Sequence, residues 1–162
     1  MPRRSTAGHA GPPSGPPRLA ALRLLGRRDF SAAELITRLV DRGYPADEVR
    51  AAVDQLTADG AVDDRRTAFA HVRTAARIKG RGRERIRREL EARGIAAADI
   101  RDALAQVTTD DDLEAIQRLL VRRRVPRPVP RDMRRRLFQQ LLRRGFPPAL
   151  VARVLDFDPT DE

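Results

Sequence analysis

The sequence predicts an all-α protein built from three tandem three-helix repeats that form an elongated, curved modular chain. After residue 18 the sequence is dominated by alanine, leucine, glutamate and arginine, which all favour helices. No alternating apolar and polar run of strand length occurs. The glycines Gly43, Gly94 and Gly145 are spaced 51 residues apart, and the sequence around them repeats. Because aromatic residues make up only 4% of the chain, we expect several small cores instead of one thick core.

The repeated segment runs over 33–53, 84–104 and 135–155 without a gap. Each copy holds two pairs of apolar residues, and the members of a pair are four positions apart, so they lie on one face of a helix. The segment therefore predicts two helices with buried stripes. The matching apolar positions are Leu35, Ile86 and Leu137; Leu39, Leu90 and Leu141; Val49, Ile100 and Val151; and Val53, Leu104 and Leu155.

Each repeated glycine is predicted to end the first of these two helices in a left-handed conformation, as the C′ residue of a Schellman cap. Counting from Gly43, the hydrophobic contact of this cap joins Leu39 to Tyr44. Proline then falls in the first turn of the next helix in two of the copies, where a missing N–H is tolerated. The same count pairs Leu90 with Ile95 and Leu141 with Phe146.

A further apolar helical segment precedes each pair of helices, at 19–28, 67–78 and 112–124. Ser31 and Glu34 match a capping box at the start of the first pair. We expect Asp112 to cap the helix that follows it and Asp132 to cap the third pair. The expected organisation is a disordered Pro/Gly-rich tail at 1–18, repeats at 19–60, 61–107 and 108–157, and an acidic end at 158–162.

Composition excludes several classes of function. The absence of cysteine removes disulfides, thiolate nucleophiles and sulfur-ligated zinc. No apolar run approaches the roughly 20 residues of a membrane span, and the N-terminus has no apolar secretory segment, so we expect a cytoplasmic protein. His71 is interpreted as a helix-face residue, and Asp110–Asp112 lack the glycine and spaced ligands of a calcium loop. We expect no enzyme, no catalytic residue, no metal and no cofactor.

The charge of the chain points to an anionic partner. There are 33 Lys and Arg residues against 23 Asp and Glu residues, for a net charge of +10. Such a balance favours a polyanion or an acidic protein surface, although GC-rich coding also favours arginine, and Lys79 is the one lysine. The charge is segregated, however: 73–93 holds nine basic and three acidic residues, and 118–144 holds eleven and one. A uniform composition bias does not predict that segregation.

The two basic stretches supply the candidate binding residues. We predict ion pairs at i,i+4 spacing for Glu84 with Arg88, Arg85 with Glu89, and Arg87 with Glu91. The turn around Gly80 and Gly82 lacks the pattern of a nucleotide-binding loop, yet the N–H groups that follow it could still meet a phosphate. The candidates without an evident local partner are Arg77, Lys79, Arg81 and Arg83 in the first stretch and Arg134, Arg135, Arg136, Arg143 and Arg144 in the second; Arg73, Arg87 and Arg88 complete the predicted filament- or nucleic-acid-binding set.

The stretch DDRRTAFAHVRTAARIKGRGRERIRRELEARGI, residues 63–95, resembles the core of the RecX family of RecA regulators. The acidic pair, the Val-Arg, the Lys-Gly-x-Gly turn, the Arg-Ile-x-x-Glu-Leu and the closing glycine carry the likeness. The flanking segments ALRLLGRRDFSAAEL and RRLFQQLLRRGFPPALVARVL are similar to the first and last repeats of that family, so the resemblance covers about 19–156. The chain departs from the family at Thr67, His71, Arg81 and Arg83, and its turn is more basic than usual.

The resemblance implies a non-enzymatic regulator that binds RecA protein and its filament on DNA. It further implies that the chain restrains strand exchange, ATP hydrolysis and the SOS co-protease activity, and so DNA repair by homologous recombination. We expect a monomer with possible direct, non-specific DNA contact. Two alternatives stay open: a non-specific nucleic-acid-binding helical-repeat protein, and a scaffold for another acidic protein. A sequence reader of the helix–turn–helix type is disfavoured, because ADEVRAAV and PALVARVL offer little to a base edge.

Overall fold

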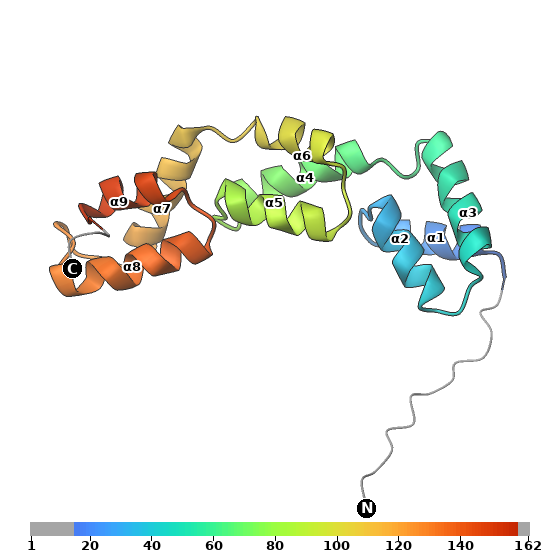
Figure 1. Cartoon of the computed structure of the whole chain (residues 1–162), viewed down its shortest axis with the longest axis horizontal. Coiled ribbons are helices and arrows are strands. Elements are labelled where there is room, and N and C mark those ends of the chain that lie inside the picture. Colours follow the sequence, from blue (N-terminus) through green and yellow to red (C-terminus); the bar gives the residue numbers. More distant parts are fainter. Residues whose placement is uncertain (1–14, 159–162) are drawn as a thin grey trace, which may run out of the picture. The chain divides into compact units, whose positions relative to one another are not determined.

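The computed structural model describes residues 15–158, and within them the chain forms nine helices and no strand (Figure 1). The predicted all-α fold class of three-helix repeats is therefore confirmed. The expected tail lies largely outside the described residues, as does most of the expected acidic end. No helix in the described part of the chain is long and apolar enough to cross a membrane.

The first repeat forms a unit of its own, from the start of the described residues to Asp63. Its helices are α1 (Pro17–Leu25), α2 (Ala32–Val40) and α3 (Ala46–Ala58). They enclose a core of Ala21, Leu24, Phe30, Leu35, Leu39, Tyr44, Val49, Val53, Leu56 and Val62. Every apolar repeat position that the sequence assigns to this copy lies in that core.

The second and third repeats together form the other unit, from Asp64 onward. The second repeat comprises α4 (Asp64–Arg77), α5 (Arg83–Ala92) and α6 (Ala97–Leu104), and the third comprises α7 (Thr109–Arg122), α8 (Arg131–Arg143) and α9 (Pro148–Leu155). Each has a separate apolar cluster, one centred on Ile86 and Leu90 and the other on Leu137 and Leu141. The expectation of several small cores is thus confirmed.

The three Schellman caps are present as predicted. Gly43 has a φ of 93°, its N–H donates to the carbonyl of Val40 over 2.8 Å, and the N–H of Tyr44 donates to Leu39 over 3.2 Å. These two hydrogen bonds define the motif. They recur at Gly94, where Ile95 bonds Leu90, and at Gly145, where Phe146 bonds Leu141. The 51-residue repeat therefore has one physical basis, a helix pair joined by a glycine that takes a left-handed conformation.

The predicted helix starts are confirmed once and corrected twice. The Ser31 hydroxyl accepts from the Glu34 N–H over 3.1 Å, and the Glu34 carboxylate accepts from the Ser31 N–H over 3.0 Å, which is the capping box. Asp132 caps nothing, because α8 begins one residue before it. Asp112 is not a cap either, since α7 begins at Thr109 and is capped by Thr108. The capping residues Thr108 and Asp111 are spaced like Ser31 and Glu34, a signal that the sequence offered.

Candidate functional site

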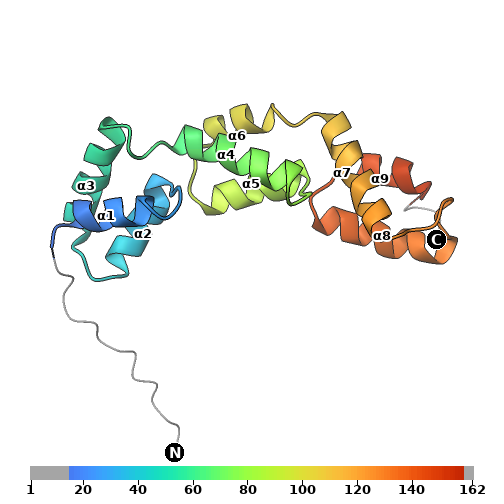
Figure 2. The same ribbon diagram turned by 180° about the vertical axis from the view of Figure 1, so that it is seen from behind.

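The third repeat docks on the second through the ends of two helices. The N–H of Gly82 donates to the carbonyl of Arg144 over 2.9 Å, and the N–H of Glu84 donates to the carbonyl of Gly145 over 3.1 Å. The C-terminal end of α8 thus meets the N-terminal end of α5, as both views show (Figures 1 and 2). These are donors that the sequence left available for a phosphate. They are used within the chain, so the turn before α5 is a joint between repeats.

The two glycines of this turn serve different purposes. Gly80 has a φ of 56°, a backbone conformation that residues other than glycine rarely adopt. Gly82 has an ordinary φ of −75°. A Cβ atom at Gly82 would lie 2.3 Å from the carbonyl oxygen of Gly145, and one at Gly145 would lie 2.3 Å from the nitrogen of Arg85. Glycine is therefore required at Gly82 by the close approach of two backbones.

A basic groove lies beside this joint. Its volume is about 530 Å³, and its walls come from the end of α4, the following turn, α7 and the residue after α8. Among the described residues, no acidic or aromatic side chain lines it. Ile78, 77% exposed, is its most exposed apolar residue. The cations that line the groove, here called the basic groove, are Arg77, Lys79, Arg118, Arg122, Arg123 and Arg144.

Like charges accumulate in the basic groove. Partial burial lowers the pKa of Arg144, and the neighbouring cations Arg123, Arg85, Arg122 and Arg81 lower it further. The guanidinium of Arg144 donates to the carbonyl of Gly80 over 3.4 Å, which ties the third repeat to the turn of the second. An anion in the groove would relieve this mutual repulsion. Arg118 is 3.2 Å from Glu114, but both side chains are exposed, and such pairs contribute little.

The structure brings only part of the predicted binding set together. Arg77 and Lys79 of the first stretch meet Arg144 of the second in the basic groove. Arg136 and Arg143 are exposed on α8 and do not line it. Sequence reasoning counted the charges of α7 but did not select them. The cations missed in this way are Arg118, Arg122 and Arg123, whose 3.6-residue helical spacing beside the turn was the available signal.

Five of the arginines that have no evident local partner in the sequence are engaged within the chain: Arg81, Arg83, Arg134, Arg135 and Arg144. Arg81 is 2.6 Å from Glu89, and Arg134 is 3.2 Å from Asp156. Arg83 donates to the carbonyl of Val107 and lies 3.9 Å from Asp112. The sequence does not reveal these three partners, because each is distant in sequence or lies beyond the helix that carries the arginine. Arg135 also interacts within the chain.

The predicted pairs along α5 are confirmed in one case. Arg85 is 2.9 Å from Glu89 at i,i+4 spacing. Arg87 pairs with Glu84 at 3.4 Å and i,i+3 spacing, and not with Glu91. Arg88 bonds the backbone carbonyl of Glu84 over 3.3 Å. These pairings keep Arg87 and Arg88 at the surface of α5.

Glu89 is the centre of a charged network inside the second repeat. Besides Arg81 and Arg85 it contacts His71, whose Nε2 lies 3.0 Å from its carboxylate. Burial raises the pKa of Glu89, but hydrogen bonds from Arg85, His71 and Arg81 outweigh this and lower it. Burial lowers the pKa of His71. The interpretation of His71 as a helix-face residue fits this structural pairing.

Asp112 is the buried acid of the unit. Only 2% of it is exposed, and burial raises its pKa to about 6, although Arg83 opposes the rise. It borders a small cavity of about 60 Å³ that Arg73 and Arg81 also line. Asp112 and Arg83 therefore belong to the joint between repeats.

Tandem three-helix repeats with a basic groove at a repeat junction define the chain as an all-α helical-repeat protein. Comparison with known proteins gives the family. Three domain families match in order: RecX, first three-helix domain, at residues 18–56; RecX, second three-helix domain, at 63–104; and RecX, third three-helix domain, at 110–155. The chain belongs to the RecX family.

Relatives named Regulatory protein RecX agree over most of their length. The one from Xanthomonas oryzae pv. oryzae is 40% identical over 141 residues, 86% of each chain. The one from Chromohalobacter salexigens is 38% identical over 130 residues, 80% of this chain and 84% of the relative. These relatives are named as regulators and not as enzymes.

Solved structures share the fold. A crystal structure of regulatory protein RecX superposes with a TM-score of 0.75 at 25% identity, covering 86% of this chain and 70% of that one. The crystal structure of RecX from Lactobacillus salivarius gives a TM-score of 0.71 at 22% identity, covering 86% and 94%. At that identity the second likeness concerns the fold alone.

Proposed function

We propose that this chain binds the RecA recombinase in its filament on DNA and restrains it, lowering strand exchange, ATP hydrolysis and SOS co-protease activity. Membership in the RecX family carries the proposal, because all three domain families match in order. Tandem repeats suit a polymeric partner, since several modest contacts made together give high avidity. The proposed setting is the cytoplasm, and the proposed active form is a monomer.

The basic groove supports direct contact with the DNA of the filament. Six cations line it with no acid among the described lining residues, and this positive charge favours phosphates. None of the described residues that line the groove is an aromatic on which bases could stack, so its contacts carry little sequence information. We therefore place the proposed DNA contact at the basic groove and not along the exposed face of α8.

The central test is inhibition of RecA. The purified chain, added in substoichiometric amounts, should reduce DNA-dependent ATP hydrolysis by RecA and should co-sediment with RecA filaments. Absence of both effects would sink the proposal. Neutralising the basic groove with Arg77→Gln and Arg122→Gln should weaken inhibition. The matched control is Arg23→Gln with Arg42→Gln, which removes the same charge from exposed positions of the first unit.

A non-specific nucleic-acid-binding protein that acts without RecA is the second candidate, and the basic groove favours it specifically. It predicts binding to an oligothymidylate in the absence of RecA, with a steep loss of affinity as salt rises. Such binding together with undiminished RecA activity would select this second function. A scaffold for another acidic protein would show neither behaviour.

A further inference from the structure

The second repeat carries a second groove, between α5 and α6. Its volume is about 520 Å³. Its apolar lining comes from Ile100 and Leu104 of α6, both buried, and from the small residues Ala97 and Ala105. This groove, here called the α5–α6 groove, shares no lining residue with the basic groove.

Comparison with the other two repeats shows why the α5–α6 groove is open. In the third repeat, 51 residues on, the position of Arg87 is held by Phe138, which is 5% exposed. The matching position of the first repeat is held by Ile36, which packs against the core of that repeat. The ring of Phe138 packs on that of Phe157, which follows α9, with the two centroids 5.1 Å apart. In the second repeat this position holds Arg87, which is exposed and lines the groove.

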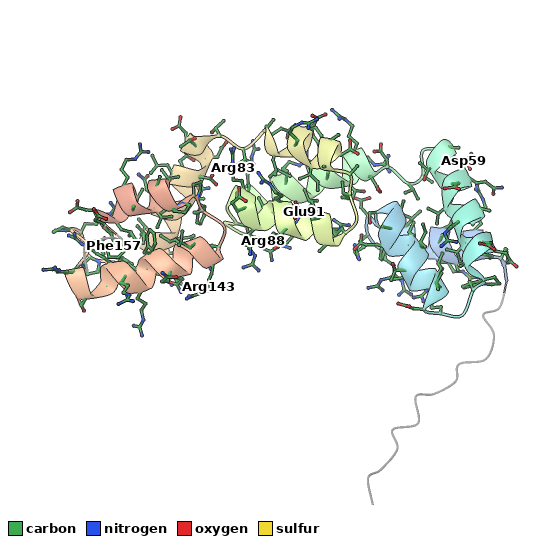
Figure 3. All side chains as sticks on the ribbon, in the orientation of Figure 1. Asp59, Arg83, Arg88, Glu91, Arg143 and Phe157 are labelled. Carbon is green, nitrogen blue, oxygen red and sulfur yellow. The ribbon has the colours of Figure 1, made fainter. Side chains whose placement is uncertain are left out.

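A second apolar position is also exchanged. Glu91 takes the place of Val40 in the first repeat and of Leu142 in the third, where Leu142 packs against the core. Figure 3 marks Glu91 on α5 and Phe157 in the third repeat. Two neighbouring turns of α5 thus break the apolar pattern that the repeat otherwise keeps. A break of the structural pattern without a local gain is expected at a functional surface.

The charges around the α5–α6 groove define the partner. Arg83, Arg87 and Arg101 line it against the single acid Glu91, a surplus of two cations. Arg83 is partly engaged by the carbonyl of Val107, whereas the pair of Arg87 with Glu84 is exposed and easily exchanged. A partner must therefore bring carboxylates for the rim. It must also bring a large apolar side chain, the kind of group that Phe138 supplies in the third repeat.

We propose that the α5–α6 groove binds an acidic segment of a partner protein that carries a large apolar side chain. Nucleic acid is the less suitable occupant, because its backbone offers no aliphatic group for Ile100 and Leu104, and the basic groove presents twice as many cations. Only the identity of the partner, a protein of the filament, rests on the proposed function. The binding itself is tested without RecA.

The probe is a fluorescein-labelled peptide in which aspartates and glutamates flank a central phenylalanine and leucine, and binding is followed by fluorescence anisotropy. The full chain should bind it, and replacing the central pair by alanines should weaken binding roughly tenfold or more. Arg87→Phe with Glu91→Leu gives two groove-lining positions the residues that the third repeat has there, Phe138 and Leu142. This double variant should lose binding by a similar factor, while its melting temperature stays equal or rises. Loss of binding with gain of stability cannot come from misfolding.

Arg88→Phe is the matched control, because Arg88 lies next to Arg87 on α5 but does not line the groove, and it should bind the peptide normally. Unchanged binding in the double variant, or equal binding of the alanine peptide, would overturn the proposal. The proposal would also be overturned if the double variant lost as much affinity for an oligothymidylate as for the peptide, since the groove would then be a nucleic-acid site. Intact peptide binding beside absent RecA inhibition would refute the proposed function and leave this site standing.

Discussion

Replacing Asp112 by asparagine should stabilise the unit formed by the second and third repeats at neutral pH. Asp112 is 2% exposed within α7, and burial raises the pKa of its carboxyl from the ordinary 3.8 to about 6. The positive charge of Arg83, 3.9 Å away, opposes this rise without cancelling it. The ionised carboxylate is therefore a net liability for the folded state.

The size of the effect follows from that pKa. A rise from 3.8 to about 6 corresponds to roughly 3 kcal/mol, and this value already includes the attraction of Arg83. Between these two pH values the folded state holds a proton that the unfolded state has released, so the free energy of unfolding falls as pH rises. Asparagine does not titrate and avoids this loss. Because its amide must find new partners, we expect a gain of about 1–3 kcal/mol at pH 7.5.

Amide hydrogen exchange of α7, corrected for intrinsic rates, measures this locally. Asp112→Asn should raise the opening free energy of α7 at pH 7.5, and the difference from the parent should vanish near pH 4. The control is Asp110→Asn, an exposed acid in the same first turn, which should lose about 0.3–1 kcal/mol through the helix dipole. A lower opening free energy for Asp112→Asn at pH 7.5, or a gain that does not change with pH, would refute the reasoning.

Three further predictions concern the joint, the charged network and the basic groove. Gly145→Ala should destabilise its unit by roughly 3 kcal/mol or more, because a φ of 87° is combined with a 2.3 Å clash between the added Cβ atom and the nitrogen of Arg85. Gly60→Ala is the control: with a φ of 72° and open space around the Cβ atom, it should lower the opening free energy by only about 1–2 kcal/mol in the same exchange measurement. Glu89→Gln should lower the opening free energy of α5 by about 1–3 kcal/mol at pH 7. Because hydrogen bonding lowers the pKa of Glu89, the difference in opening free energy between variant and parent should shrink as pH falls below 4.5. A difference that stays constant with pH would contradict the network. Arg77→Gln with Arg122→Gln should reduce the slope of log affinity against log salt for an oligothymidylate by about 1–2, and an unchanged slope would remove the phosphates from the basic groove.

The helix pairs could be predicted from sequence because their determinants are local. The cap is specified by Gly43 together with Leu39, four positions before it, and Tyr44, one position after it. The same pattern recurs in each repeat. Ser31 and Glu34 likewise meet within one helical turn. Where prediction failed locally, as at Asp112, the cause was a one-turn error in the helix start, which Thr108 and Asp111 would have corrected.

The binding surfaces could not be predicted in the same way, because their residues meet across long stretches of chain. The basic groove joins Lys79 to Arg144, 65 positions apart. Charge counting identified both stretches but could not show which cations share a groove and which are consumed by internal pairs. Arg81 and Arg83 looked available from their neighbours, yet Glu89 and Val107 engage them.

Gly82 shows how one exchange within the repeat creates the joint that supports the basic groove. Its counterpart in the first repeat is Ser31, whose hydroxyl accepts an N–H in the first turn of α2. Glycine has no side chain to do this, and in the first turn of α5 the N–H of Glu84 bonds the carbonyl of Gly145 instead. The capping acceptor of the second repeat thus comes from the third repeat. The missing side chain also permits the close approach of the two backbones, because a Cβ atom at Gly82 would lie 2.3 Å from the carbonyl oxygen of Gly145. Glycine in place of serine therefore removes the local cap and allows the third repeat to supply its replacement. The same approach brings the guanidinium of Arg144 to the carbonyl of Gly80, and so to the cations of the turn.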